Sequence, residues 1–182
     1  MSEIFLSQNP IDGSLLHSAY DYANMRSDDN RTRVGALILL NAEKQKGFTP
    51  IILGSNIYKG LSSQDLSVVK NYINNFKDWK NEVITHAERD ALDTAREFGY
   101  SLKDSTMYVT DVPCTNCTDN IMESDISEII SHFDVFKVKP ESKVSKDLEN
   151  IDRLLKAGKS FGFYKGVIGH TKALYDNIAW NP

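Results

Sequence analysis

Apolar residues along this chain recur either at helical spacing or in short runs of strand length, and the two patterns alternate. Over residues 11–26 the spacing predicts a helix with one packed face. Apolar runs at 34–40 and 51–56, separated by the polar, Gly- and Pro-containing stretch 41–50, predict a hairpin. Residues 62–81 return to helical spacing. The face expected for the first helix consists of Leu15, Leu16, Ala19, Tyr22, Ala23 and Arg26.

The second half of the chain continues the alternation. The expected elements are a helix from Thr85 to a C-cap at Gly99, a strand at 105–111, a short helix at about 115–124, a strand at 127–133, a helix with the stripe Leu148, Ile151, Leu154 and Leu155 that ends at Gly158, and a strand at 160–164. We interpret the polar stretch 139–146 as a connector and a candidate boundary, and 166–182 as a C-terminal helix or arm. This order favours an α/β fold in which helices cover a mixed sheet.

Length and composition fit one domain. The 182 residues, 41% of them hydrophobic, are enough for a single packed core, and we expect one domain over 1–182 with its core at about 11–165. Lys and Arg number 21 against 25 Asp and Glu, a net charge of -4. Sequence-independent binding to phosphate backbones needs a basic surface, so this balance disfavours nucleic acid as a partner.

The sequence carries no sign of secretion or of membrane insertion. Its start, MSEIFLSQNP, lacks a basic segment followed by an apolar run. No apolar stretch approaches the roughly 20 residues that span a bilayer. The two cysteines are separated by two residues and cannot join distant parts of a fold, which fits a reducing compartment. We therefore expect a cytoplasmic protein without a membrane partner.

Two short stretches carry the candidate chemistry: THAERDAL at 85–92 and DVPCTNC at 111–117. Cys114 and Cys117 are three residues apart at the predicted start of a helix, so both sulfurs can face the same side. The unpaired N–H groups and the dipole at a helix start favour thiolate, the form that binds zinc. His86 begins the preceding helix, and a right-handed crossover would bring the two helix starts to one sheet edge. These three side chains are therefore candidate zinc ligands.

Three ligands favour a catalytic zinc, which keeps one position for water, over a closed structural zinc, which usually has four protein ligands. The other histidines, His17, His132 and His170, have no ligand spacing. Glu88 lies two residues past His86 and would point at the zinc-bound water. Zinc lowers the pKa of that water to about 7 from about 15.7, and a carboxylate beside it can move the proton.

Each part of this pattern also has a plainer explanation. Thr85-x-x-Glu88 fits a capping box, in which the Glu bonds back to the cap residue. Cys-x-x-Cys alone fits a thioredoxin-like redox pair. A single His at a helix start is more often structural than a ligand. The specific signal is the combination of His-x-Glu with a later Pro-Cys-x-x-Cys.

At these residues the chain resembles the zinc-dependent cytidine/deoxycytidylate deaminase superfamily, whose signature is H-x-E followed by P-C-x-x-C. HAE at 86–88 and TMYVTDVPCTNC at 106–117 match its two halves, and the resemblance extends over about residues 15–138. RSDDNRTRVGALIL at 26–39 resembles the deoxycytidylate deaminases, and the roughly 30-residue insertion between Asn56 and His86 is typical of that branch.

The resemblance implies a three-layer cytidine-deaminase-like α/β fold, with a central mixed β-sheet flanked by helices. It implies the hydrolytic deamination of a cytosine nucleotide, dCMP to dUMP and ammonia, in which zinc-bound hydroxide attacks C4 and Glu88 shuttles protons. The implied ligands of one catalytic zinc ion are His86, Cys114 and Cys117. The implied substrate contacts are Asn56 to the sugar, the Ala87 N–H to the pyrimidine edge, Thr110 in the base pocket and Arg26 to the 5′-phosphate.

The resemblance further implies a homo-oligomer, a hexamer or a dimer, and Mg²⁺ accompanying a nucleotide effector. Arg31 and Arg33 are additional candidates for the phosphate. Ile57 stands where the family prefers glycine after the asparagine, which leaves room for a different nucleotide specificity. Two alternatives therefore remain. One is a deaminase of another nucleoside, base or modified nucleotide, and the other is a non-catalytic nucleotide-binding protein with a structural zinc.

Overall fold

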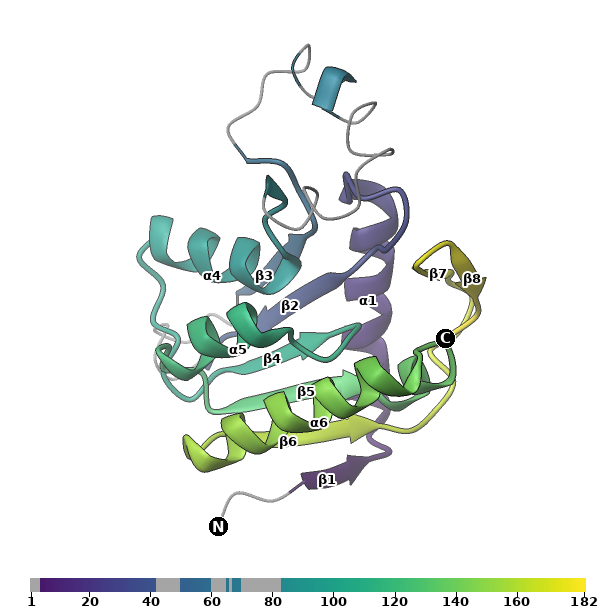
Figure 1. The fold of residues 1–182 in the computed structure, drawn as a ribbon. Coiled ribbons are helices and arrows are strands. Elements are labelled where there is room, and N and C mark those ends of the chain that lie inside the picture. Colours follow the sequence, from purple (N-terminus) through teal and green to yellow (C-terminus); the bar gives the residue numbers. More distant parts are fainter. Residues whose placement is uncertain (1–3, 42–49, 60–64, 66, 70–82) are drawn as a thin grey trace.

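The computed structural model describes residues 4–41, 50–59, 65, 67–69 and 83–182, and is built around one six-stranded sheet (Figure 1). Its strands are β1 (Ile4–Ser7), β2 (Gly35–Leu39), β3 (Ile51–Ser55), β4 (Thr106–Val109), β5 (Glu128–His132) and β6 (Ser160–Tyr164). The helices around it are α1 (Pro10–Arg26), α4 (Ala87–Glu97), α5 (Thr115–Met122) and α6 (Glu141–Lys156). Most of the helix expected over 62–81 lies outside the described residues, of which 65 and 67–69 are helical. Most of the turn expected over 41–50 also lies outside them.

The sheet is mixed, as the sequence predicts. Its strand order is β1-β6-β5-β4-β2-β3. β2 runs antiparallel to both β3 and β4, which confirms the expected hairpin. β4, β5, β6 and β1 are mutually parallel, with α5 and α6 as the crossovers between β4, β5 and β6. Parallel strands end at the same edge, so the segments that follow β4 and β5 lie on one side of the molecule.

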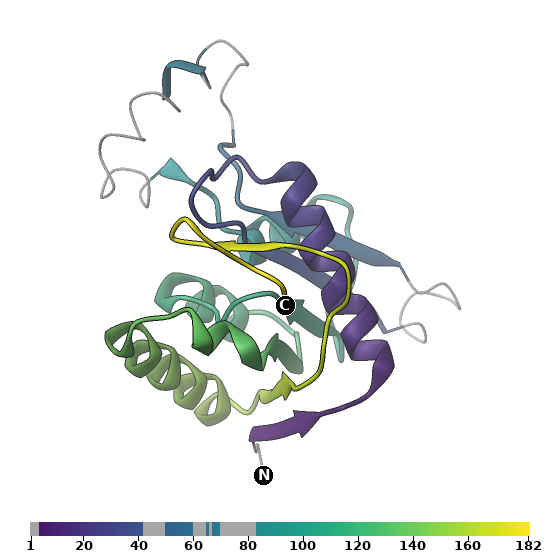
Figure 2. The ribbon, with the colours of Figure 1, turned by 90° about the vertical axis from the view of Figure 1, so that its right-hand side faces the viewer.

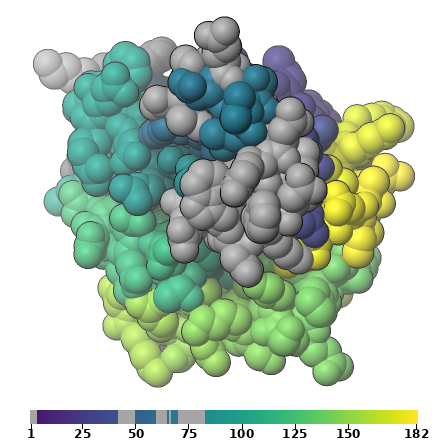
Figure 3. Space-filling view, turned by 45° about the horizontal axis from the view of Figure 1, so that its top comes forward, coloured from purple at the N-terminus to yellow at the C-terminus, as the bar shows by residue number. Residues whose placement is uncertain are grey.

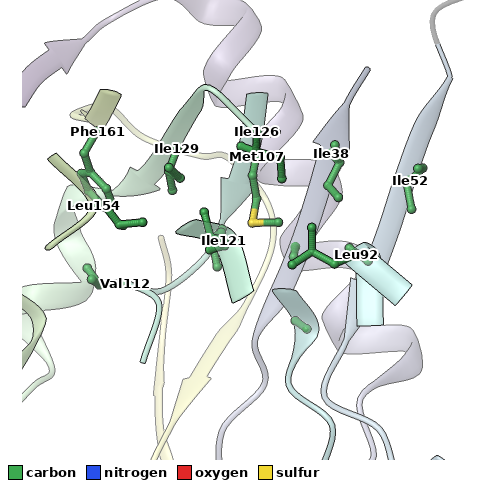
Figure 4. Close-up of a cluster of buried hydrophobic side chains, with 14 of the residues drawn as sticks. Ile38, Ile52, Leu92, Met107, Val112, Ile121, Ile126, Ile129, Leu154 and Phe161 are labelled. Atoms are coloured by element: carbon green, nitrogen blue, oxygen red, sulfur yellow. The ribbon is translucent and has the colours of Figure 1, made fainter. Parts of the chain in front are cut away.

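Helices cover both faces of the sheet, α1 on one and α4, α5 and α6 on the other (Figures 1 and 2). Neighbouring residues of each strand point to opposite faces and enter different cores. The core under α4, α5 and α6 contains Ile38, Met107, Ile129 and Phe161, with Leu92, Ile121 and Leu154 from the helices (Figure 4). The core under α1 contains Leu37, Tyr108, Ile130 and Tyr164, with Leu16, Ala19 and Tyr20 from the helix. This is the expected three-layer arrangement.

Local sequence explains where α1 begins and why α4 packs so closely on the sheet. Asn9 caps α1 by accepting the Ile11 N–H, and Pro10 follows in the first turn. A Cβ on Gly54 of β3 would lie 2.2 Å from the Ala87 carbonyl oxygen, so only a glycine lets the first turn of α4 rest directly on the sheet. The expected face of α1 is wrong at Tyr22, which is half-buried, and at Arg26, which is exposed, whereas Tyr20, outside the expected face, is buried.

Three features of the fold differ from the sequence predictions. Strand β1, outside the expected core, pairs with β6 and extends the sheet. The stretch 139–146 is not a connector, because α6 begins at Glu141 and occupies most of it. Of the two alternatives for 166–182, the helix is wrong: the segment is an arm that contains the two-stranded hairpin of β7 (Ala173–Tyr175) and β8 (Ile178–Trp180). In the described part of the chain, the helices are too short or too polar to cross a membrane.

Candidate active site

The three predicted ligands meet between the first turns of α4 and α5. His86 is the N-cap residue of α4, Cys114 is the N-cap residue of α5, and Cys117 lies in the first turn of α5. The Nδ1 atom of His86 is 3.3 Å from the Cys114 sulfur and 3.5 Å from the Cys117 sulfur. The three ligand atoms all lie within 4.8 Å of one another.

Hydrogen bonds from neighbouring segments fix both helix starts. The Ala87 N–H, directly after His86, donates to Oδ1 of Asn56 at the end of β3. The Pro113 carbonyl, directly before Cys114, accepts the hydroxyl of Thr118 and the side-chain amide of Asn150 from α6. Each ligand thus belongs to a backbone segment that is tied to the core of the fold.

These side chains fit a zinc ion. Imidazole nitrogen and thiolate sulfur are its preferred protein donors, and three of them leave a fourth tetrahedral position for water. The pKa of Cys114 is lowered, because the Cys117 thiol and His86 both hydrogen-bond its thiolate. The pKa of Cys117 is raised, because its thiol donates to Cys114 and is buried. One sulfur is therefore already disposed to be the thiolate.

Glu88 lies beside the three candidate ligands, in the first turn of α4. Its side chain is 3% exposed, and burial raises the pKa of the carboxyl to about 7, with the Cys114 sulfur contributing to the rise. The capping-box alternative does not describe this helix start, since the N-cap of α4 is His86 and no side chain caps it. Thr85 instead pairs its backbone with Ile57. The carboxyl is therefore available for chemistry near neutral pH.

A cavity of about 190 Å³ opens in front of these groups. Its described lining consists of Asp29, Thr32, Val34, Asn56, Ile84, His86, Glu88, Asp111, Val112, Cys114, Lys143, Tyr175 and Asp176. Glu88 and Asn56 are buried, whereas Lys143 and Asp176 are exposed, so the cavity runs from the ligand cluster outward to solvent. In the space-filling view, yellow residues of the C-terminal segment lie beside purple residues of the N-terminal part of the chain (Figure 3).

One predicted substrate contact, Asn56, lies at this cavity, and it bonds to another, the Ala87 N–H. Asn56 is 5% exposed and lines it. Its Oδ1 accepts the Ala87 N–H at 3.1 Å, and its Nδ2 donates to the Thr32 carbonyl at 3.1 Å. The Ala87 N–H is thus occupied by Asn56 in this structure. Direct contact of either group with a sugar or a base stays a prediction.

Thr110 and Arg26 lie elsewhere. The Thr110 hydroxyl accepts the Gly35 N–H, and the residue lines a smaller space of about 10 Å³ that shares Thr32, Val34, Asp111 and Tyr175 with the main cavity. Arg26 is exposed at the end of α1 and is absent from the described lining.

Sequence reasoning missed the outer part of the cavity. Lys143 lies in the first turn of α6, within the stretch interpreted as a connector. Tyr175 and Asp176 come from the C-terminal hairpin. Pro140, a residue that often precedes a helix, was a signal for α6. No local pattern connects the hairpin to a site formed about 60 residues earlier.

Comparison with known proteins agrees with this geometry. Residues 10–133 match the family model described as "Cytidine and deoxycytidylate deaminase zinc-binding region". The human deoxycytidylate deaminase is 28% identical over 126 residues, which cover 69% of this chain and 67% of the human protein.

Solved structures show the fold. The dCMP deaminase of cyanophage S-TIM5, in complex with dCMP and dUMP, has a TM-score of 0.60 at 18% identity, covering 87% of this chain and 99% of that one. A diaminohydroxyphosphoribosylaminopyrimidine deaminase/5-amino-6-(5-phosphoribosylamino)uracil reductase from Thermotoga maritima has a TM-score of 0.56 at 21% identity, covering 85% of this chain and 36% of that one.

Proposed function

Since this chain belongs to the cytidine and deoxycytidylate deaminase family, and is thus a hydrolase acting on a C–N bond, we propose that its substrate is a cytosine nucleotide and that it converts dCMP to dUMP and ammonia. The observation that carries this proposal is the meeting of His86, Cys114 and Cys117 beside the buried Glu88, at the inner end of one cavity. The choice of dCMP draws its support from the human relative.

In this proposal His86, Cys114 and Cys117 hold one catalytic zinc ion. Zinc at such a site supplies an activated water and polarises the group under attack. Glu88 would accept a proton from the attacking water and give it to N3 of the cytosine ring. It would then accept the proton of the new hydroxyl at C4 and give it to the amine, which leaves as ammonia while the 4-oxo group forms. A carboxyl whose pKa is raised to about 7 can both accept and donate near neutral pH. The buried position of Glu88 keeps bulk water from competing for these protons.

The outer end of the cavity suits a phosphate. Lys143 lines it and brings a positive charge. Arg31 lies beside it, ion-paired to Asp176 of the lining at 2.9 Å, and within the described residues its Nε atom is buried without a hydrogen-bond partner. Lys143 is therefore better placed than Arg26 for a 5′-phosphate, with the Arg31–Asp176 ion pair beside it. Asn56 keeps its proposed role at the sugar, because its buried side chain lines the cavity beside the His86–Ala87 segment.

The proposal carries further expectations. They are a single domain over 1–182, a homo-oligomer, and a cytoplasmic enzyme that acts on a free nucleotide. The predicted Mg²⁺ with a nucleotide effector also stays an expectation.

The test follows the loss of cytosine absorbance when the zinc-loaded protein is mixed with dCMP, with deoxycytidine in parallel. Glu88→Ala is expected to keep its zinc and lose about 10²- to 10⁴-fold in kcat, the usual contribution of a general acid–base group. Glu97→Ala, an exposed carboxyl at the end of the same helix, is the matched control and should match the wild type. Turnover by Glu88→Ala near the wild-type rate would refute the proton-transfer role. Absence of turnover of any cytosine nucleotide by the zinc-loaded wild type would refute the proposed substrate.

A further inference from the structure

The C-terminal hairpin is a built element with a defined tip. Tyr175 pairs with Ile178, and the two residues between them have positive φ angles, 44° at Asp176 and 69° at Asn177. This is the conformation of a two-residue type I′ turn, in which Asp and Asn are favoured. The turn therefore fixes the direction in which the side chains of Tyr175 and Asp176 point.

The tip is docked on the loop that follows α1 (Figure 2). The Arg33 N–H donates to the Leu174 carbonyl at 2.9 Å, and the Asn177 N–H donates to the Arg31 carbonyl at 2.9 Å. The Asp176 N–H donates to the Thr32 hydroxyl at 3.0 Å. The ion pair of Arg31 with Asp176 adds a fourth contact. This set of contacts holds the hairpin against the edge of the cavity.

The other end of the segment is anchored in the core under α1. The ring of Trp180 stacks on His132 with a centroid distance of 5.6 Å and an interplanar angle of 9°. It also meets the edge of Tyr20 at 6.2 Å. Tyr175 and Asp176 line the cavity, so this anchored hairpin forms part of the cavity wall.

The ring of Tyr175 is positioned by a buried ion cluster. Lys139 places its ammonium 5.5 Å from the centre of the ring. That ammonium is ion-paired with Asp111 and, at 2.5 Å, with Asp147. Asp111 lines the cavity three residues before Cys114. The cluster thus links the orientation of Tyr175 to the segment that carries the ligands.

We propose that the β7–β8 hairpin is the outer wall of the substrate cavity and that Tyr175 contacts the sugar–phosphate part of the bound nucleotide, which makes it a specificity-determining residue. This inference rests on the proposed function. The ligand cluster and Glu88 take the base at the inner end, so the rest of the substrate extends toward Lys143, Tyr175 and Asp176. Asp176 is neutralised by Arg31 and does not repel a phosphate there. Burial and the nearby Asp111 raise the pKa of Tyr175, so its hydroxyl remains a hydrogen-bond donor.

The test compares Tyr175→Ala with Ile178→Ala. Ile178 faces Tyr175 across the hairpin, is 50% exposed and is absent from the described cavity lining, so it is a matched control. In Tyr175→Ala we expect KM for dCMP and the dissociation constant for dUMP to rise about tenfold, with kcat within about threefold. Zinc content and melting temperature should stay at the wild-type values. Ile178→Ala should remain within about twofold of the wild type in all of these measurements.

The outcomes separate the two proposals. If the wild type deaminates dCMP and Tyr175→Ala behaves like Ile178→Ala, the inference is wrong and the proposed function stands. If Tyr175→Ala loses zinc or loses kcat with KM unchanged, Tyr175 supports the metal site and does not contact the substrate, which also overturns the inference. If the wild-type protein neither deaminates dCMP nor binds dUMP, both proposals fail together. Tyr175→Phe then locates the contact: recovery of wild-type KM assigns it to the ring, and a KM like that of Tyr175→Ala assigns it to the hydroxyl.

Discussion

The inner and outer halves of the cavity are built in different ways. The inner half comes from two helix starts that are close in sequence, with His86 and Cys114 only 28 positions apart. The outer half is assembled from the loop after α1, the first turn of α6 and the C-terminal hairpin, where Arg31 meets Asp176 over 145 positions. The residues that would carry the reaction thus form a local motif, whereas the residues that would choose the substrate depend on the tertiary fold.

The inner half of the cavity is also more deeply buried than the outer half. Cys117 and Glu88 are each 3% exposed, and both stand on helices packed against the sheet. Lys143 and Asp176 are exposed at the rim. A substitution in the inner half is therefore expected to abolish metal binding or catalysis. A substitution in the outer half is expected to weaken substrate binding by a limited factor.

The largest effect is expected from Cys117→Ser in the inner half. A serine hydroxyl stays protonated at neutral pH and is a poor zinc ligand, so the variant should lose its zinc and more than about 99% of its activity. Metal analysis and the absorbance assay measure this directly. The exposed neighbour Asn116→Ser is the control and should retain both zinc and activity. A Cys117→Ser variant with full zinc would show that this sulfur is not a ligand.

An intermediate effect is expected in the outer half from Lys143→Ala. Loss of one charged contact to a phosphate should raise KM for dCMP about tenfold, equivalent to about 1.4 kcal/mol, and leave turnover of deoxycytidine unchanged. Arg26→Ala serves as the comparison, since Arg26 is absent from the described cavity lining. The ratio of KM values for dCMP and deoxycytidine is the measurement. A larger change in Arg26→Ala than in Lys143→Ala would reverse the assignment.

The smallest effect is a pH dependence of stability from His132, on which Trp180 of the hairpin stacks. His132 is fully buried, with Nδ1 at 3.2 Å from the Tyr20 hydroxyl and Nε2 at 3.2 Å from the Gly166 carbonyl. Burial lowers its pKa below 6.5, with Lys137 contributing in the same direction and Asp134 and the Gly166 carbonyl opposing it.

The sign of this pH dependence follows from proton binding. Because the folded state binds a proton at His132 less readily than the unfolded state, the stability from the neutral ring is complete above pH 6.5 and is lost as the pH falls below it. His132→Asn should be less stable than the wild type at pH 8 by about 1 kcal/mol, with the difference shrinking toward pH 5. Urea unfolding at both pH values measures it. A constant difference would contradict the assignment.

The sequence predicted most of the inner half because its chemistry needs particular residue types at fixed spacing. A His at one helix start and a Cys-x-x-Cys at the next were enough to identify a cluster that the structure then brings within 4.8 Å. Within the described residues, the order of strands and helices from the 34–40 strand to the 160–164 strand could also be predicted. The periodicity of α1 was less decisive, since Tyr20 and Tyr22 both fit a helix and only packing against β2 and β4 selects Tyr20.

The outer half could not be predicted because exposed polar residues carry little pattern. Lys143 belongs to a helix whose first turn is polar, and nothing in its neighbours indicates a cavity. The hairpin did leave a signal: Asp176 and Asn177 are residues that tolerate positive φ, and short apolar runs flank them. That signal predicts a turn but not the partner on which the turn docks.

The long sequence separation of the hairpin contact implies an order of assembly. Closing the short segment between the helix starts costs less chain entropy than joining the loop after α1 to a tip about 145 residues later. As the chain emerges from the ribosome, the ligand cluster and the central strands can therefore form before the outer wall of the cavity. The β7–β8 hairpin then completes that wall. Competence to bind metal would thus precede competence to select a substrate during synthesis.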